Sequence, residues 1–530
     1  MEDKGNSEYS CGMDIKEQCL KRIAEEAKLF TGKRQAEEKL SESLVLQCLH
    51  ANHLGDGILF AVMHQREFVF NNAEASWLQW GGYHWIQDKT NRAAAAVETI
   101  CEPYMKLLGT RATICPDDGK EMLKEKQELQ REILRRVRWL RTEKGRQEVL
   151  KFAAANKIFD LHIEGNEIDR KPLLLACANG VVHLPTGELW QGDPQQYLVK
   201  ASPVKYRGAT VPAPLWEKTI DEIFGGDAET IEYLQRVLGY CISGLTRERL
   251  FLALVGPKGW NGKSTVVETL AYILGPLAQP IASEMLLSNK NARNSAAPSP
   301  DIMALRGLRM AFASEADENR RYSPAMIKRL TGGDTLTGRA AHAPHEVSFK
   351  PSHKIILLTN EIPTAPADDE AFWRRYQSIK FPFTFVDEPK EPHERQRNKN
   401  LFEELTQEAP GILAWLVRGF MEYERIGLKA PASVQDEVDT HRALDDFLGT
   451  WITEEVLERE EASTRTSNLY ARFDSWYREN YGKKPPGMTV FVRKLSKRFE
   501  SGKDPVTRRS VFYGLELTKE AAESLAMSGR

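Results

Sequence analysis

The stretch that decides the fold runs LFLALVGPKGWNGKST over residues 250–265, and the run VVETLAYIL follows it directly. The apolar start predicts a buried strand, the glycines predict a loop, and the run after them predicts a helix. A glycine-rich loop lets backbone N–H groups wrap a phosphate, and a helix N-terminus adds unpaired donors. Lys263 would place a charge on the β- and γ-phosphate oxygens, and the Ser264 hydroxyl would ligate Mg²⁺. The stretch therefore predicts a phosphate-binding P-loop.

The spacing of this loop departs from the strict Walker A pattern by one residue. Five residues separate Gly256 from Gly262, where the pattern has four. Either the loop carries an extra residue or Gly259 shares the role of the first glycine. A glycine-rich turn that contains a lysine by chance is the plain alternative, and the flanking strand and helix disfavour it. The expected ATP-binding residues are Gly256, Gly259, Asn261, Gly262, Lys263, Ser264 and Thr265.

A second apolar run, LRMAFASE at residues 308–315, predicts a buried strand that ends in an acid. A carboxylate beside a P-loop can activate the attacking water, so Glu315 is the expected catalytic base. Ser314 stands where many such strands carry a Mg²⁺-binding aspartate. Metal binding is therefore expected to rest on Ser264 and waters, with help from Glu315 or Asp317.

Two further candidates follow downstream. The run KIILLTN ends at Asn360, whose side chain can hold the attacking water or the γ-phosphate. Asparagine after a strand is more often only a turn residue, but its place on the next strand after Glu315 favours the functional interpretation. Arg374 and Arg375 directly precede the run YQSIKFPF. One of them could neutralise transition-state charge on the nucleotide of a neighbouring subunit, and a surface ion pair is an equally good interpretation.

Short β-rich runs alternate with helical segments between residues 250 and 385, which predicts a largely parallel sheet with helices on its faces. Upstream, residues 119–155 predict one long helix or two in tandem, and a hairpin turned at residues 185–187 precedes a helical pair. The fold class is α/β. The expected parts are a mixed α/β N-terminal accessory domain, a helical lead-in, the ATPase core, a helical subdomain with linker and a C-terminal domain, at residues 1–208, 209–249, 250–385, 386–446 and 447–530.

Four motifs carry a resemblance to a known family. They are GPKGWNGKST, LRGLRMAFASE, KRLTGGDTLTGRAAHAPHEVSFKPSHKIILLTNEIP and FWRRYQSIKFPF, in this order. Together they resemble the superfamily 3 DNA helicases of AAA+ fold, in the phage and plasmid primase-helicase branch that includes poxvirus NTPase-like proteins.

The resemblance implies a role for each matching position. It favours Arg375 over Arg374 as the arginine finger, because Arg375 abuts the strand. The other implied roles are the Walker A residues for Lys263 and Ser264, the Walker B acid for Glu315 and the sensor for Asn360.

The family also places a hairpin between the Walker B and sensor strands, where it projects into a central channel and grips single-stranded DNA. Here that stretch is GGDTLTGRAAHAPHEVSFK at residues 332–350. Basic side chains on a glycine-flanked hairpin suit phosphate tracking. His342 and His345 could instead form a metal pair, but no third ligand with suitable spacing accompanies them. The unranked DNA-binding candidates are Lys328, Arg339, His342, His345 and Lys350.

The C-terminal stretch shows helix, turn, helix and hairpin in the order of a winged-helix domain. Residues 483–511 contain nine Lys or Arg and two acidic residues, a net charge of +7. Such a patch is typical of binding to duplex or forked DNA, and a winged helix used for protein contacts is the alternative. The expected DNA-binding residues here are Arg493, Lys494, Lys497, Arg498, Arg508 and Arg509.

Composition excludes some classes of protein. The 530-residue chain has 73 Lys and Arg against 75 Asp and Glu, a net charge of −2, so any binding to nucleic acid must be local. No apolar run is long enough for a membrane span, and the N-terminus is polar and acidic, so we expect no export signal. The seven cysteines are scattered without CxxC spacing, which fits a reducing, cytoplasmic setting.

Together these features predict an ATP-dependent replicative DNA helicase of a phage, plasmid or mobile element. Its ligand would be MgATP, and its subunits would form a ring, expected to be a hexamer, that travels 3′→5′ on single-stranded DNA. The first 110 residues lack the metal-binding pattern of a primase, so priming would fall to a separate partner. The alternatives are an AAA+ remodelling or defence ATPase, and an origin-binding scaffold with a weakened ATPase.

Overall fold

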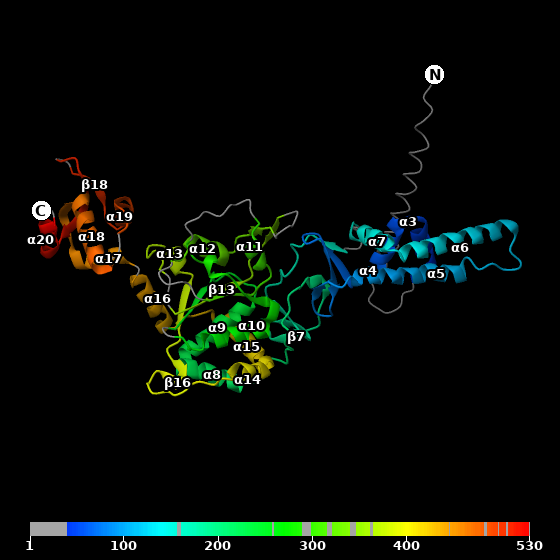
Figure 1. Cartoon of the computed structure of the whole chain (residues 1–530), viewed down its shortest axis with the longest axis horizontal. Helices are drawn as coiled ribbons and strands as arrows, with labels where there is room; N and C mark the ends of the chain where they lie inside the picture. The colour runs from blue at the N-terminus through cyan, green and yellow to red at the C-terminus, as the bar shows by residue number, and fades with distance from the viewer. Residues whose placement is uncertain are drawn as a thin grey trace, which may run out of the picture.

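A computed structural model places the N-terminal helices and the C-terminal unit at opposite ends of a central sheet (Figure 1). The predicted site residues Glu315, His342, His345 and Lys497 lie outside the described residues, as does Asp317. Among the helices that the structure describes, none is long and apolar enough to cross a membrane. The described residues are 40–155, 161–256, 259–288, 298–314, 321–339, 346–360, 364–444, 446–481, 485–496, 498–504 and 507–528.

The N-terminal unit is a helical bundle whose apolar faces meet around residues such as Phe60 and Ile133. Residues 119–155 form two helices in tandem, one of the two predicted outcomes, because α6 ends at Leu140 and α7 begins at Glu143. The helices are α2 (Glu42–His50), α3 (Asn52–Met63), α4 (Arg92–Ala96), η1 (Val97–Ile100), α5 (Cys101–Thr110), α6 (Lys120–Leu140) and α7 (Glu143–Ala155).

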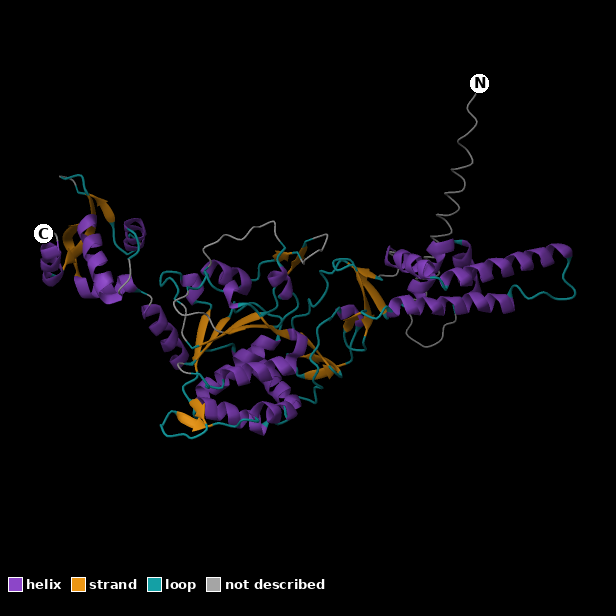
Figure 2. Cartoon of the chain, in the orientation of Figure 1, coloured by secondary structure: helices purple, strands orange, loops and turns teal. Residues whose placement is uncertain are grey.

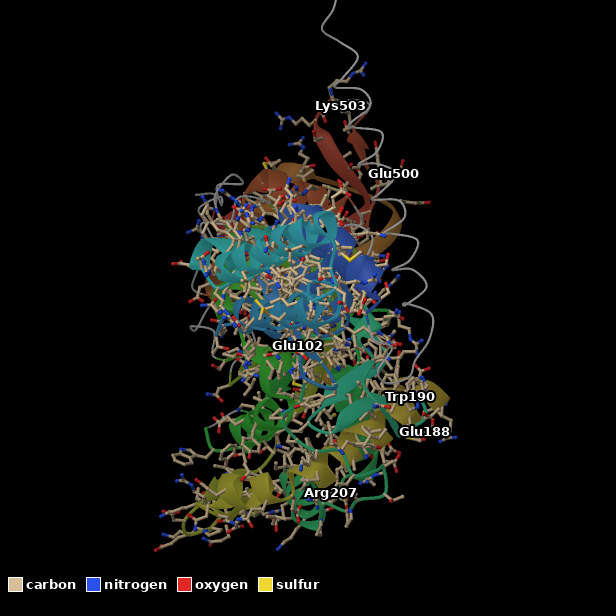
Figure 3. The ribbon with its side chains drawn as sticks, turned by 90° about the vertical axis from the view of Figure 1, so that its right-hand side faces the viewer. Glu102, Glu188, Trp190, Arg207, Glu500 and Lys503 are labelled. Carbon is tan, nitrogen blue, oxygen red and sulfur yellow. The ribbon has the colours of Figure 1, made fainter. Side chains whose placement is uncertain are left out.

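Two small sheets connect this bundle to the centre of the molecule. The first has the order β3-β2-β1-β4 and the second the order β5-β6-β7. The predicted hairpin at residues 185–187 is confirmed, since β6 and β7 pair antiparallel with Val182 opposite Leu189. Figure 3 shows Glu188 and Trp190 of β7 at the surface. The strands are β1 (Phe68–Asn71), β2 (Ser76–Trp80), β3 (Trp85–Gln87), β4 (His162–Ile163), β5 (Leu174–Cys177), β6 (Gly180–His183) and β7 (Glu188–Trp190), followed by η2 (Pro194–Gln196).

The central sheet has five strands in the order β14-β8-β13-β10-β9. All neighbouring strands run parallel, so the predicted parallel sheet is confirmed. Strand β8 lies between β13 and β14, and the chain then crosses to the far edge to form β9. Ligands of such sheets bind outside the carboxyl ends of the strands, where the strand order reverses. The strands are β8 (Phe251–Val255), β9 (Ala278–Pro280), β10 (Met310–Ser314), β13 (Lys354–Thr359) and β14 (Tyr376–Lys380).

Side chains of β8 alternate between two apolar layers, as the two-residue period of a strand requires. Leu252 and Leu254 pack against α8, α9, α10 and α15, whereas Phe251 and Ala253 pack beneath α11, α12 and α13. Figure 2 shows helices on both sides of these strands. The helices are α8 (Pro214–Phe224), α9 (Ala228–Ile242), α10 (Lys263–Leu274), η3 (Gly275–Leu277), η4 (Ser283–Met285), α11 (Pro300–Ala304), α12 (Pro324–Thr331), α13 (Glu370–Trp373), α14 (Leu401–Gln407), α15 (Ala409–Ile426) and α16 (Ala432–Leu444).

Two short strand pairs stand beside the central sheet. Strands β11 (Leu336–Gly338) and β12 (Val347–Phe349) pair antiparallel inside the predicted DNA-binding stretch, and residues 340–345 between them are outside the described residues. Strands β15 (Thr384–Val386) and β16 (Glu394–Gln396) pair parallel after β14.

The C-terminal unit has its own aromatic core, which includes Trp451, Phe473 and Phe491. Its sheet has the order β17-β19-β18 and is antiparallel. Figure 3 shows Lys503, at the end of β18, at the periphery of this unit. The elements are α17 (Phe447–Glu455), β17 (Val456–Arg465), α18 (Thr466–Tyr481), α19 (Met488–Leu495), β18 (Ser501–Lys503), β19 (Ser510–Leu517) and α20 (Lys519–Ser528).

Two buried cations hold neighbouring elements against the central sheet. The guanidinium of Arg309, which is 2% exposed, donates to the carbonyl oxygens of Lys171 and Leu174, each at 3.1 Å. Burial lowers the pKa of Arg309 to about 10. Burial likewise lowers the pKa of Lys354 to about 7, and its Nζ donates to the carbonyl oxygen of Ser243. The Arg309 bonds hold the small sheet against the start of β10, and the Lys354 bond holds the end of α9 against the start of β13.

A buried ion pair fastens the N-terminal bundle. Arg136 Nη1 lies 2.9 Å from Asp56 Oδ2, and Tyr104 donates its hydroxyl to Asp56 Oδ1 at 2.8 Å. The Asp56 side chain is fully buried, and its pKa is raised, first by desolvation and against the opposing effect of Arg136. Removing only the cation would leave a buried carboxylate without compensation.

We therefore expect Arg136→Leu to lower the free energy of unfolding of the bundle by about 3–5 kcal/mol at pH 8. A raised folded-state pKa means that the folded chain binds a proton more readily than the unfolded chain and gains stability as pH falls. The deficit of Arg136→Leu should therefore shrink toward pH 5. Thermal unfolding at both pH values measures it, with the exposed Arg135→Leu as control. Equal losses in the two variants, or a deficit that grows as pH falls, would contradict this.

Candidate nucleotide-binding site

The P-loop connects the end of β8 to the first turn of α10. Gly262 is the N-cap of α10 with φ +87°, a conformation that favours glycine. A cavity of about 530 Å³ lies against this turn and is lined by all of Gly259–Thr265. The unpaired N–H groups of a helix N-terminus make such a cavity suitable for an anion. The loop thus presents its backbone and the predicted side chains to one cavity.

The Lys263 ammonium is held at the inner wall of this cavity. Its Nζ donates to Asn360 Oδ1 at 2.9 Å, to the Gly256 carbonyl oxygen at 3.2 Å and to Asn261 Oδ1 at 3.3 Å. Lys263 is only 7% exposed. The structure therefore brings the predicted Walker A lysine and the predicted sensor asparagine into direct contact, although 97 residues separate them in sequence.

Asn261 ties the loop to the segment that follows β14. Its side chain accepts from Lys263 and donates through Nδ2 to the Phe383 carbonyl oxygen at 2.9 Å. Asn261 is 2% exposed. Its buried side chain therefore connects the loop to the segment after β14. The sequence singled it out as a ligand-contacting residue, and its structural role in orienting Lys263 could not be read from the motif.

The glycines of the loop differ in what their surroundings demand. A Cβ on Gly256 would lie 2.6 Å from Lys263 Nζ, and one on Gly262 would lie 2.9 Å from the Ile223 side chain. A Cβ on Gly259 would meet no atom of the described residues within 4 Å. Packing within the protein therefore requires glycine at positions 256 and 262, and it places no such requirement on position 259.

Other strand ends complete the wall. Ser264 and Thr265 line the cavity from α10, Ser314 lines it from β10 and Thr359 lines it from β13. Hydroxyl groups of this kind, together with phosphate oxygens and water, suit Mg²⁺, which prefers oxygen ligands. Ser264 thus fits the predicted metal role, whereas Glu315 directly follows Ser314 outside the described residues.

Several cavity residues were not found from the sequence. Arg397 and Lys399 belong to the run VDEPKEPHERQRNKN, whose mixed charges give no signal that distinguishes a binding site from a solvated surface. Apolar residues such as Ile223, Leu358 and Leu401 belong to runs whose pattern is typical of a core. The missed lining residues are Thr219, Ile223, Trp260, Glu268, Leu358, Thr359, Phe385, Arg397, Asn398, Lys399, Leu401 and Phe402.

The two predicted finger arginines do not line the cavity of their own chain. Arg374 lies 3.4 Å from Glu370 Oε2 and its side chain is 79% exposed. Arg375 donates to the Ala371 carbonyl oxygen, and desolvation, then nearby Arg249, lower its pKa.

An acidic segment, Asp368–Glu370, pairs with several basic residues, two of them predicted to bind DNA. Lys328 lies 2.8 Å from Asp369, and Lys494 of α19 lies 3.3 Å from Asp368. Glu370 lies 2.9 Å from Arg442 of α16. These pairs connect α12, α16 and α19 to the turn that precedes Arg374 and Arg375.

The remaining predicted DNA-binding residues have different surroundings. Arg498 lies 2.7 Å from Asp446, and the backbone N–H of Arg339 donates to Ser299 Oγ. The other described candidates, Lys350, Arg493, Arg508 and Arg509, are exposed. The described residues, to which His342 and His345 do not belong, contain no group of three or more potential metal ligands.

Comparisons with known proteins agree with the resemblance seen in the motifs. Residues 57–225 match the family model described as D5 N terminal like. An Acanthamoeba polyphaga mimivirus protein named "Putative helicase" is 29% identical over 339 residues, which are 60% of this chain and 34% of the relative. The predicted resemblance to phage and viral primase-helicases is confirmed.

A second relative, from Invertebrate iridescent virus 3, carries the same name and is 25% identical over 356 residues, 60% of this chain and 36% of its own length. The chain thus spans about a third of the length of these two relatives. Among solved structures, the apo C-terminal region of NrS-1 is 12% identical, with 86% of this chain and 98% of that chain covered and a TM-score of 0.41.

The glycine contacts give a test of the loop geometry. Gly262→Ala should cost about 1–2 kcal/mol, because alanine disfavours positive φ and its Cβ would press on Ile223. Gly259→Ala should change the stability by less than about 0.5 kcal/mol. Thermal unfolding of the two variants without nucleotide measures the difference. Equal losses, or a larger loss in Gly259→Ala, would show that the loop is built differently.

Proposed function

We propose that this chain is an ATP-dependent, ring-forming replicative DNA helicase. The contact between Lys263 Nζ and Asn360 Oδ1, at 2.9 Å in the wall of the cavity, carries the proposal. A phosphate-binding lysine beside a polar group on the neighbouring strand is the arrangement that a γ-phosphate requires. The family resemblance and the names of the viral relatives support the same activity.

Each residue then has a role in hydrolysis. Lys263 would neutralise the β- and γ-phosphates, and Ser264 would hold Mg²⁺, which would supply further positive charge to the phosphates. Glu315 would activate the attacking water, and Asn360 would bind the γ-phosphate. Arg375 would reach the nucleotide of the neighbouring subunit, with Arg374 as the second candidate.

The wider architecture fits this activity. A parallel sheet with the P-loop strand between β13 and β14 supports the assignment of an AAA+ core. A three-stranded antiparallel sheet with α18 and α19 supports a winged-helix domain. In the proposed hexamer, the β11–β12 pairs would face the channel and track one DNA strand 3′→5′, while the C-terminal unit binds the fork.

The proposed setting is replication of a phage, plasmid or other mobile element in the cytoplasm, with a separate primase as partner. The five cysteines that the structure describes are unpaired, which fits a reducing compartment.

Substitution of the P-loop lysine tests the proposed activity. We expect the chain to hydrolyse ATP faster when single-stranded DNA is present. Lys263→Ala should lower that rate at least about 100-fold, because no cation would then neutralise the charge that develops on the phosphates in the transition state. The exposed Lys205→Ala is the control. Steady-state phosphate release and strand displacement on a forked duplex measure both steps. A hydrolysis rate that does not change with DNA would favour a remodelling ATPase. No hydrolysis by the unmodified chain would contradict the proposal.

The C-terminal patch makes a separate prediction. Arg508 and Arg509 are exposed, so Arg508→Ala with Arg509→Ala should weaken binding to forked DNA and reduce the salt slope by about one per lost phosphate contact. Arg478→Ala is the matched control, because Arg478 lies outside the patch and pairs with Asp474 at 2.8 Å. Fluorescence anisotropy over a salt series measures the slopes. An unchanged slope in the double variant would favour protein contacts for this unit.

A further inference from the structure

The nucleotide cavity has a second end that the phosphate chemistry does not use. Lys263, Ser264 and Asn360 mark the phosphate end. The other lining residues come from the lead-in helix α8 and from the segment after β14, which lies on the opposite side of β8 from β13. A nucleoside triphosphate anchored at Lys263 must place its sugar and base within the rest of the cavity. The residues that line this rest of the cavity include Thr219, Ile223, Phe385, Arg397, Leu401 and Phe402, together with Trp260 of the loop.

Trp260 is unusual among the residues that line this cavity. Its side chain is large and apolar, yet the residue is 62% exposed. Its backbone has φ +66°, a conformation that bulky residues rarely adopt, and the Phe385 N–H donates to its carbonyl oxygen at 2.8 Å. The longer P-loop thus holds an indole at the cavity at a cost in backbone energy, which is typical of functional positions.

Arg397 fixes the orientation of this indole. The Arg397 guanidinium carbon lies 3.7 Å from the centroid of the Trp260 ring. The backbone N–H of Arg397 donates to the Val386 carbonyl oxygen at 2.9 Å. Cation–π stacking on one face restrains the ring. Trp260 is 62% exposed even though Arg397 covers one face of its ring, so much of the indole is open to solvent.

We propose that Trp260, backed by Arg397, is the platform on which the base of the bound nucleoside triphosphate stacks. This inference rests on the proposed function, and it explains what the extra loop residue does. Stacking on an indole tolerates any base but favours the larger surface of a purine over a pyrimidine. The site would therefore prefer ATP and GTP to CTP and UTP.

The location of Trp260 separates this role from two others. A core tryptophan would be buried, as Trp216 and Trp451 are. A tryptophan that stacks on DNA would be expected on the β11–β12 pair or on α19, whereas Trp260 lies directly before Asn261, which contacts the P-loop lysine. Trp260 therefore lies where a bound nucleotide would contact it.

The test compares ATP with inorganic tripolyphosphate, which carries the phosphates and lacks a base. Binding of each to the full chain with Mg²⁺ is measured by calorimetry. We expect Trp260→Ala to bind ATP on the order of 10- to 100-fold more weakly, and tripolyphosphate within about twofold of the unmodified chain. Trp260→Phe should recover most of the ATP affinity, because a phenyl ring still stacks. The affinity for CTP should fall less than the affinity for ATP in Trp260→Ala.

Two controls make the result decisive. Trp190→Phe, at an exposed tryptophan outside the cavity, should leave both affinities unchanged. ATP should quench a fluorescence component that is present in the unmodified chain and absent in Trp260→Phe. Equal weakening of ATP and tripolyphosphate in Trp260→Ala, or no weakening of either, overturns the platform. An unmodified chain that binds neither ligand overturns the proposed function, and the platform with it.

Discussion

The site depends on one ammonium group, that of Lys263, and on the oxygens that hold it. Asn360 reaches it from β13, and Asn261 reaches it from within the loop while also holding the segment after β14. A charged group that is so little exposed needs several acceptors, so three stretches that are distant in sequence must converge. The order of the central sheet allows this, because β8 lies between β13 and β14.

A second set of charges connects the turn before Arg374 and Arg375 to three helices. The acidic segment Asp368–Glu370 pairs with basic residues of α12, α16 and α19. Asp369 also accepts from the Phe372 N–H at 3.0 Å and so begins the short helix that precedes the two arginines. Some of the acidic and basic residues that balance in the net charge of −2 are thus paired with one another in the fold.

Much of the sheet and part of the site could be predicted from the sequence. Buried parallel strands are continuous apolar runs in sequence, so the runs of β8, β10, β13 and β14 predicted strands. Asn360 was predicted as a sensor, and the structure places its Oδ1 2.9 Å from Lys263 Nζ, while its sensor role stays a prediction. The contact between Trp260 and Arg397 could not be predicted, since it depends on how a charged loop folds back. The sequence shows that Lys328 and Lys494 are basic, but it does not predict that they pair with Asp369 and Asp368.

The most direct measurement is an electron cryomicroscopy map of the chain with Mg²⁺, a non-hydrolysable ATP analogue and single-stranded DNA. We expect rings in which the γ-phosphate contacts both Lys263 and Asn360 and the base lies toward the segment after β14. A nucleotide bound elsewhere, or a bound nucleotide that touches Lys263 while Asn360 points away, would contradict the central claim.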